Sequence, residues 1–268
     1  MKRIRVFEAF AGIGAQHEGW SRLQKDYSSD VQFEFVGISE IDRYAEISYK
    51  AAHGDVTNFG DVTQIDWGGQ IPDFDMFTWS FPCTDISNAG KQAGLSAESG
   101  TRSSLAWECI KALRIKRPKW ALMENVKALM QKKFAADFAQ LRKEIEDLGY
   151  VNYYAVMNSK DFGVAQNRER VFMVSILRTE DDPNPTYNFP KGFPLTKCVE
   201  DYMEPAEDIG EEYYISQDRV TDKVLSDMLD QPNVREEMEK LYHAEWNFHH
   251  LHGRFPKDGE LENETNSL

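Results

Sequence analysis

A short apolar run, Met76-Phe77-Thr78-Trp79-Ser80, stands between Asp75 and Pro82. A run of this length, with charged or turn-forming residues at both ends, is typical of a strand buried on both faces of a parallel sheet. Parallel sheets occur in α/β proteins, where ligands bind beyond the carboxyl ends of the strands. Cys83 follows at that position.

Cys83 has two interpretations. A cysteine on a polar loop can act as a nucleophile when its surroundings favour the thiolate, whereas a cysteine in a core is inert. Pro82 fixes the backbone directly before it, and the loop is polar at Thr84, Asp85 and Ser87. A lone free cysteine is nonetheless most often a small buried thiol, so the nucleophile interpretation depends on the context below.

Composition limits the classes of function. The chain has 268 residues, enough for one large α/β domain with or without an appendage. It carries 45 acidic against 31 basic side chains and a net charge of −14, which argues against binding nucleic acid or an anionic membrane over its whole surface. A polyanion must therefore meet a local basic patch or a partner chain.

Three widely spaced cysteines, Cys83, Cys109 and Cys198, form no CxxC pair. This pattern indicates reduced thiols in an intracellular protein. The first residues lead into a strand rather than a signal peptide, and no apolar run is long enough to span a bilayer. We expect a cytoplasmic protein without a membrane segment or a bound metal.

A strand at 4–10, a glycine-rich turn at 11–15 and a helix at 16–27 are predicted at the start of the chain. This order forms a cradle for a nucleotide, because glycines allow the backbone to approach the ligand. The turn contains Gly12 and Gly14 but lacks the third glycine of GxGxxG, which favours a ligand without a pyrophosphate. An ordinary tight turn is the alternative.

Two acidic side chains extend this cradle. Glu40 ends a predicted strand at 33–39, where an acid commonly binds ribose hydroxyls; an exposed strand-end carboxylate is the alternative. Asp61 ends a predicted third strand, and its carboxylate can accept from an adenine amine. Gly-Asp also marks ordinary turns. A helix is predicted between these two acids, starting at Asp42 and continuing through Tyr49.

A second buried strand, at 120–123, leads into Glu124-Asn125-Val126. If the two apolar strands are neighbours, Cys83 and Glu124 lie at the same edge of the sheet. A carboxyl group beside apolar residues suits a general acid, and an acid that favours a helix start is the alternative. The apolar spacing of the preceding helix, at 104–113, predicts Cys109 in the core.

Gln166, Arg168 and Arg170 alternate between predicted strands at 153–157 and 170–177. Alternation by two predicts that the three side chains share one strand face. Arginines on one face can bind a phosphate or a base, although a solvated edge strand has the same pattern.

Five motifs occur in order along the chain: Phe10-Ala11-Gly12-Ile13-Gly14, Glu40, Pro82-Cys83 with Ser87, Glu124-Asn125-Val126, and Gln166-Asn167-Arg168-Glu169-Arg170. This ordered set, within the first two thirds of the chain, resembles the cytosine-C5 DNA methyltransferase family. The resemblance implies an α/β, Rossmann-like S-adenosylmethionine-dependent methyltransferase fold, a mostly parallel sheet with helices on both faces. We expect this catalytic domain at residues 1–178, and a connector with a short acidic extension at 179–268.

The resemblance also assigns site residues. The catalytic group would be Cys83, Glu124 and Arg168. S-adenosyl-L-methionine would lie against Phe10, Ala11, Gly12, Ile13, Gly14, Glu40, Ile41, Asp61 and Val62, with Glu40 on the ribose and Asp61 near the adenine. The substrate would contact Ser87, Asn125, Gln166 and Arg170.

In the implied reaction, Cys83 adds to C6 of a cytosine while Glu124 hydrogen-bonds or protonates N3, and C5 then takes the methyl group. Arg168 would help hold the base. The cytosine must leave double-stranded DNA to be reached, which implies base flipping, with the loop at 88–102 as a lid. A role in restriction-modification or in the protection of phage DNA fits this activity.

The chain departs from the family pattern chiefly at its end. Beyond Leu177 we find neither a target-recognition region nor the closing motifs, and the tail after residue 200 is acidic. A helix is predicted at 220–241. Three explanations remain: a split enzyme with a complementing chain, an inactive fragment, or a shortened lineage. An RNA cytosine methyltransferase and a catalytic-type subunit that needs a partner are the alternative functions.

Overall fold

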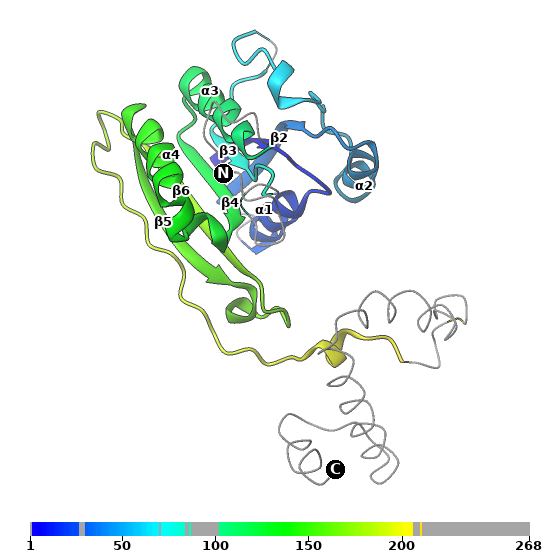
Figure 1. Cartoon of the computed structure of the whole chain (residues 1–268). Helices are drawn as coiled ribbons and strands as arrows, with labels where there is room; N and C mark the ends of the chain where they lie inside the picture. Colours follow the sequence, from blue (N-terminus) through cyan, green and yellow to red (C-terminus); the bar gives the residue numbers. More distant parts are fainter. Residues whose placement is uncertain are drawn as a thin grey trace, which may run out of the picture. The chain divides into compact units, whose positions relative to one another are not determined.

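The structure is a computed structural model that describes residues 2–26, 30–69, 71–83, 86, 102–205 and 210 (Figure 1). The chain divides into two units, Met1–Asp201 and Tyr202–Leu268, and the first carries all the strands described below. Ser87, the predicted helix at 220–241 and all but the last residue of the predicted lid at 88–102 lie outside the described residues.

Six strands form one sheet in the order β2-β1-β3-β4-β6-β5. β2, β1, β3 and β4 pair in parallel, whereas β6 pairs antiparallel with both β4 and β5. Five of the six therefore share one direction, and β6 runs the other way between two of them. The strands are β1 (Lys2–Ala9), β2 (Val31–Ser39), β3 (Met76–Trp79), β4 (Trp120–Val126), β5 (Tyr150–Asn158) and β6 (Glu169–Leu177).

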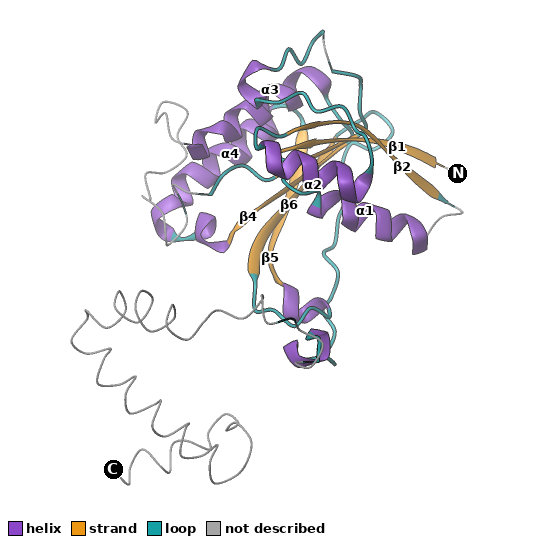
Figure 2. Ribbon diagram, turned by 90° about the vertical axis from the view of Figure 1, so that its right-hand side faces the viewer, coloured by secondary structure: helices purple, strands orange, loops and turns teal. Residues whose placement is uncertain are grey.

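Helices lie on both faces of the sheet, as expected for parallel strands joined by crossovers. The α-helices of the described residues are α1 (Ala15–Asp26), α2 (Arg43–His53), α3 (Ala106–Lys116) and α4 (Ala135–Asp147). α3 and α4 pack on the face that carries Phe77 and Met123. α1 lies over the opposite face, where Trp20 shares a cavity with Leu122. Figure 2 shows α3 beside α4, and α1 across β1 and β2.

The core forms where α3 and α4 meet the sheet. Phe7 and Phe77 are fully buried there. The centroid of the Phe7 ring lies 5.4 Å from the centroid of the Phe74 ring and 5.3 Å from that of the Trp67 ring. Burying one such side chain contributes about 1.5–3 kcal/mol. The prediction for Cys109 is confirmed, because its side chain is completely buried and burial raises the pKa of its thiol.

The third strand predicted before Asp61 is wrong. Asn58 makes a single β-bridge with Ile38, and Asp61 caps the short 3-10 helix Val62–Gln64 by accepting from Thr63 N at 2.9 Å. Hydrogen bonds to a side chain replace the backbone hydrogen bonds of a strand here. Asn58 Oδ1 accepts from the backbone N–H groups of both Glu40 and Gly60.

The single strand face predicted for Gln166, Arg168 and Arg170 is also wrong. β6 begins at Glu169, so Gln166 and Arg168 lie in the loop before it. Gln166 N donates to Val164 O at 2.7 Å, a tight turn that breaks the extended backbone. The local turn therefore overrides the alternating pattern.

The segment that follows β6 packs against the rest of the first unit. Tyr153 Oη donates to Pro185 O at 2.8 Å, and the Phe193 ring packs edge-on against that of Phe162. The expected boundary after residue 178 thus falls inside the first unit, which extends to Asp201. In the part of the chain that the structure describes, no helix is long and apolar enough to cross a bilayer.

Candidate functional site

The turn between β1 and α1 has a left-handed backbone at two glycines. φ is +56° at Gly12 and +84° at Gly14, in the left-handed region that glycine enters at little cost. A side-chain carbon at Gly14 would collide with the His53 ring, whereas one at Gly12 would meet no atom within 4 Å. The turn is therefore packed against α2 at Gly14 and open to a ligand at Gly12.

Phe10 is also left-handed, with φ of +58°. For a residue with a side chain this conformation costs about 1–3 kcal/mol, and such outliers cluster at functional sites. The bend lets the chain leave β1 and turn over the end of the sheet.

Glu40 fastens this turn to the end of β2. Its Oε2 accepts from Gly12 N and its Oε1 from Asp42 N, both at 2.8 Å. Asn58, which sequence reasoning missed, donates to Glu40 O at 2.9 Å and also accepts from Gly60 N. The predicted acids Glu40 and Asp61 thus lie on loops that one asparagine side chain holds together.

The remaining residues predicted to bind the cofactor differ in exposure. Ile13 and Ile41 expose 63% and 78% of their surface, so both present apolar side chains near the turn. Val62 is only 3% exposed and packs in the core. The Val62 side chain therefore cannot make the cofactor contact that was predicted for this residue.

Cys83 lies on the loop beyond β3 and is half-buried. Its exposure is intermediate between that of the fully buried Cys109 and that of the exposed Cys198. Hydrogen bonds hold the loop on both sides of it. Ser103 Oγ donates to Pro82 O at 2.8 Å, and Ile86 N donates to Cys83 O at 3.1 Å. The thiol is thus held in place at the edge of the sheet without being enclosed in the core.

Asn125 departs from the substrate contact predicted for it. The residue is 3% exposed; its Nδ2 donates to Phe81 O at 3.0 Å and its Oδ1 accepts from Val126 N at 2.8 Å. Both polar atoms are engaged within the protein because the strand alternation turns Asn125 toward the core. Asn125 therefore fastens the segment before Cys83 to β4.

Glu124 lies at the same edge as Cys83. Trp79 of β3 stands opposite Met123 of the neighbouring β4, so both functional residues follow at the carboxyl ends of adjacent parallel strands. Glu124 Oε1 lies 3.1 Å from Arg170 Nε, and the two side chains are 24% and 23% exposed. The structure thus brings Glu124 together with Arg170.

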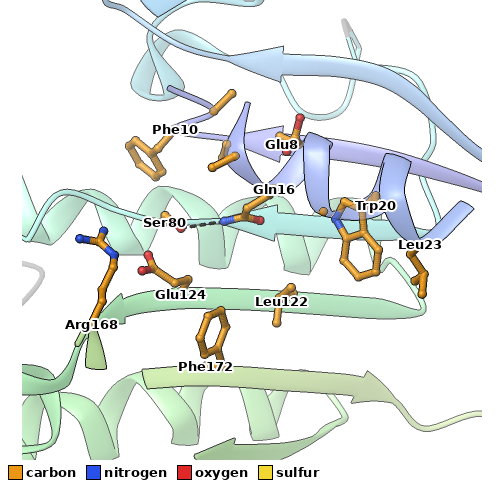
Figure 3. Close-up of a pocket in the computed structure, with 14 residues that line it drawn as sticks. Glu8, Phe10, Gln16, Trp20, Leu23, Ser80, Leu122, Glu124, Arg168 and Phe172 are labelled. Atoms are coloured by element: carbon orange, nitrogen blue, oxygen red, sulfur yellow. Dashed lines mark hydrogen bonds between the residues drawn. The ribbon is translucent and has the colours of Figure 1, made fainter. Parts of the chain in front are cut away.

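Arg168 and Gln166 lie on the exposed loop before β6. The Arg168 side chain extends toward the Glu124 carboxylate (Figure 3). Within the described ranges its guanidinium has no ion-pair partner, whereas that of Arg170 is engaged. Arg168 is therefore the arginine of this motif that remains available to a substrate.

A cavity of about 640 Å³ lies between α1 and the sheet, a size that suits a nucleoside-containing ligand. Its lining includes Phe10 and Ala11 of the glycine turn at one side and Glu124 and Arg168 at the other. Gln16, missed by sequence reasoning, spans the gap by donating to Ser80 Oγ at 2.7 Å, the dashed line of Figure 3.

A second cavity, of about 410 Å³, shares Glu124 and Arg168 with the first. It continues past Arg170 toward Tyr187 and Phe189, in the segment after β6. Two cavities thus meet at Glu124 and Arg168. No cluster of three His, Cys, Asp or Glu side chains suited to a metal ion occurs among the residues described.

The family model for the C-5 cytosine-specific DNA methylase matches residues 4–260. The chain belongs to this family. The family implies a methyl donor and a DNA substrate, and its match continues about 90 residues beyond Arg170, the last motif residue found in the sequence.

Three relatives illustrate how much of a C-5 cytosine methylase the chain contains. The type II methyltransferase M2.ScrFI of Lactococcus lactis subsp. cremoris is 37% identical over 280 residues, covering 84% of this chain and 74% of the relative. The orphan methyltransferase M.SssI of Spiroplasma monobiae is 31% identical, covering 74% and 64%, and M.NlaX of Neisseria lactamica is 34% identical, covering 80% and 63%. The chain thus spans less than two thirds of the second and third relatives.

The alignment with M2.ScrFI is longer than the whole 268-residue chain. That relative therefore contains residues without a counterpart in this methylase.

Solved structures confirm the fold class. The Entamoeba histolytica methyltransferase EhMeth superposes with a TM-score of 0.62 at 17% identity, covering 84% of this chain and 67% of the other. The S. pombe Dnmt2 methyltransferase superposes at 0.58 and 19%, covering 82% and 65%. The methylase therefore has the Rossmann-like fold of these methyltransferases.

Proposed function

We propose that the chain transfers a methyl group from S-adenosyl-L-methionine to C5 of a cytosine flipped out of double-stranded DNA. The observation that carries the proposal is that two cavities meet at Glu124 and Arg168. One reaches the glycine turn and the other opens away from it. A donor that reaches from the glycine turn past Phe10 and Ala11 into the first cavity would meet a base in the second cavity beside Glu124.

The glycine turn fits a nucleoside-containing donor that has no pyrophosphate. The space over Gly12 is open, and Ile13 and Ile41 offer apolar surface to an adenine. The Glu40 carboxylate already accepts from Gly12 N and Asp42 N, but it has lone pairs left for ribose hydroxyls. S-adenosyl-L-methionine, when bound, supplies an electrophilic methyl group.

Cys83 supplies the nucleophile in this proposal. Cytosine C5 does not attack a methyl group until a nucleophile adds to C6. Addition of the Cys83 thiolate at C6, with a proton given to N3 by Glu124, places the electron pair on C5. After C5 takes the methyl group, loss of its proton breaks the C6–S bond and releases Cys83.

The two arginines have separate roles. Arg170 orients the Glu124 carboxylate through their ion pair, and Arg168 binds the base or a phosphate from the exposed loop. Ser87 and Gln166 remain proposed substrate contacts. DNA carries dense negative charge, so a chain with a net charge of −14 is expected to need a complementing chain for target recognition.

The proposal includes a cytoplasmic location and a role in restriction-modification or phage DNA protection. Methyltransferases named type II, and orphan methyltransferases of Bacillus phages, are among the relatives. The match covers 64% of M.SssI and 33% of the orphan methyltransferase of Bacillus phage rho11s.

The test is transfer of labelled methyl groups from S-adenosyl-L-methionine to unmethylated DNA and to RNA by the full chain, followed by base analysis. We expect 5-methylcytosine in DNA, none with Cys83→Ser, and unchanged transfer with the control Cys198→Ser, because Cys198 is exposed and its thiol donates to Asp201, away from the carboxyl ends of β3 and β4. Label in RNA alone, or activity in Cys83→Ser, would overturn the proposal.

A further inference from the structure

A row of buried polar side chains lies behind the glycine turn. Glu8 of β1 is 2% exposed, Tyr49 of α2 is fully buried and His17 of α1 is 7% exposed. The Tyr49 hydroxyl lies 2.6 Å from Glu8 Oε2 and 2.6 Å from His17 Nδ1. Three elements thus share one hydrogen-bonded chain in the interior.

His53 connects this chain to the turn. Its ring stacks on the His17 ring with centroids 4.4 Å apart, and its Nε2 lies 3.2 Å from Ile13 O. The same ring occupies the space beside Gly14. A continuous path therefore runs from a carboxyl group inside the sheet to the backbone of the turn.

The charge states of the row follow from burial. Burial raises the pKa of Glu8 to about 7, although hydrogen bonds from Tyr49 and the His17 backbone act the other way. Burial, together with the charge of His53, lowers the pKa of His17 to about 4, so His17 is neutral. Glu18 faces His17 from α1, and Glu124 and Arg168 face Glu8 across the first cavity.

We propose that Glu8, Tyr49, His17 and His53 form a positioning unit that holds the glycine turn in its ligand-binding shape, with the negative charge on Glu8 setting the direction of the two hydrogen bonds that join Glu8, Tyr49 and His17. The inference rests on the proposed function, because it takes the turn as the donor site. None of the four is a catalytic residue; each acts through the turn.

The charge fixes the direction because a carboxylate can only accept. When Glu8 is ionised, Tyr49 donates to it, and the Tyr49 oxygen accepts from His17 Nδ1–H. When Glu8 is protonated, it can donate to Tyr49, which then donates to His17 Nδ1, and the His17 proton moves to Nε2. His17 changes tautomer without changing charge.

The ionised state should be the better binder. Burial opposes ionisation of Glu8, but the hydrogen bond from Tyr49 favours it, because hydrogen bonds to a carboxylate are roughly twice as strong as those between neutral groups. Ionised Glu8 therefore holds Tyr49 of α2, and with it His53, more firmly, although its burial costs the fold free energy. Donor affinity should therefore fall as the pH drops through the titration of Glu8.

The test is equilibrium binding of S-adenosylhomocysteine and S-adenosyl-L-methionine to the full chain between pH 5.5 and 8.5. For both ligands we expect about a tenfold loss of affinity toward low pH, which corresponds to a shift of about one unit in the pKa of Glu8 on binding. Glu8→Gln should remove this dependence. Tyr49→Phe should move its midpoint to higher pH, and the exposed control Tyr44→Phe on the same helix should leave it unchanged.

A second measurement needs no ligand. Nitrogen chemical shifts of the imidazoles should show His17 changing tautomer with the titration of Glu8 in the wild type, and not in Glu8→Gln. A pH-independent His17 tautomer would overturn the positioning unit, as would a pH effect confined to S-adenosyl-L-methionine, which would mean that Glu8 acts on the sulfonium charge. Failure of either ligand to bind at any pH would instead count against the proposed function.

Discussion

Glu124 and Arg170 face each other from adjacent antiparallel strands, with Glu124 Oε1 3.1 Å from Arg170 Nε. The register places Val126, not Glu124, opposite Arg170, so the pair is diagonal. Its position at the junction of two cavities means that Arg170 determines where the Glu124 carboxylate points.

Substituting this pair should separate its two roles. Glu124→Gln removes the acid and should lower the rate of methyl transfer about 100-fold, since general acid catalysis contributes about 10²–10⁴-fold. Arg170→Lys keeps the charge but loses the planar guanidinium and should lower the rate less. Single-turnover methyl transfer measures both effects. The control is Arg114→Lys, in an exposed ion pair with Glu144; equal losses in all three variants would contradict the assignment.

Asn125→Ala should destabilise the protein by about 1–3 kcal/mol, because it leaves the buried Phe81 carbonyl without its donor. It should also slow methyl transfer, since the segment before Cys83 is no longer fastened to β4. Urea denaturation measures the free energy of unfolding. The exposed Asn184 provides the control, Asn184→Ala, for which we expect no change. Unaltered stability in Asn125→Ala would mean that the buried hydrogen bond is unimportant.

The two glycines of the turn should respond differently to alanine. At Gly14 the new methyl group meets the His53 ring and the backbone is left-handed, so Gly14→Ala should lower the melting temperature and donor binding together. At Gly12 only the left-handed conformation opposes the change, at a cost of about 1–2 kcal/mol, while the methyl group enters the open space over the turn.

Gly12→Ala should therefore lose binding of S-adenosylhomocysteine with little loss of stability. Thermal unfolding and calorimetric titration of the same samples test this contrast. Tight binding by a stable Gly12→Ala variant would show that the ligand lies elsewhere.

Glu8 gives a pH dependence of stability. Its pKa rises from 4.5 to about 7 on folding, so its protonated form stabilises the fold, and that contribution is lost as the pH rises from about 4.5 through 7. The total is on the order of 3 kcal/mol, at 1.36 kcal/mol per pKa unit. Glu8→Gln does not titrate at this position. As the pH rises across this window, the free energy of unfolding of Glu8→Gln should therefore increase relative to that of the wild type. A constant difference across it would contradict the burial of an ionisable Glu8.

The sequence predicts those parts of the site that depend on short runs of residues. Apolar runs mark β3 and β4, and the polar residues that follow them place Cys83 and Glu124 at one edge of the sheet, as the strand pairing confirms. The glycine turn is likewise predicted from the spacing of Gly12 and Gly14.

Contacts between residues that are far apart in the sequence cannot be predicted from short runs in this way. Tyr49 reaches Glu8 across 41 positions, and Gln16 reaches Ser80 across 64. The charged Glu8 within an apolar strand is a signal of a buried partner, but nothing local identifies Tyr49. The alternation at Gln166 and Arg168 led to the wrong prediction of a shared strand face. A tight turn, which depends on three-dimensional context, breaks the extended backbone there.

Covalent capture tests most directly whether Cys83 attacks a cytosine. The full chain and S-adenosyl-L-methionine are incubated with duplex DNA that carries 5-fluorocytosine, because fluorine cannot leave C5 as a proton does and the adduct persists. Peptide mass spectrometry should then find the base on the sulfur of Cys83, with no adduct in Cys83→Ser. No adduct, or one on a different residue, would contradict the account.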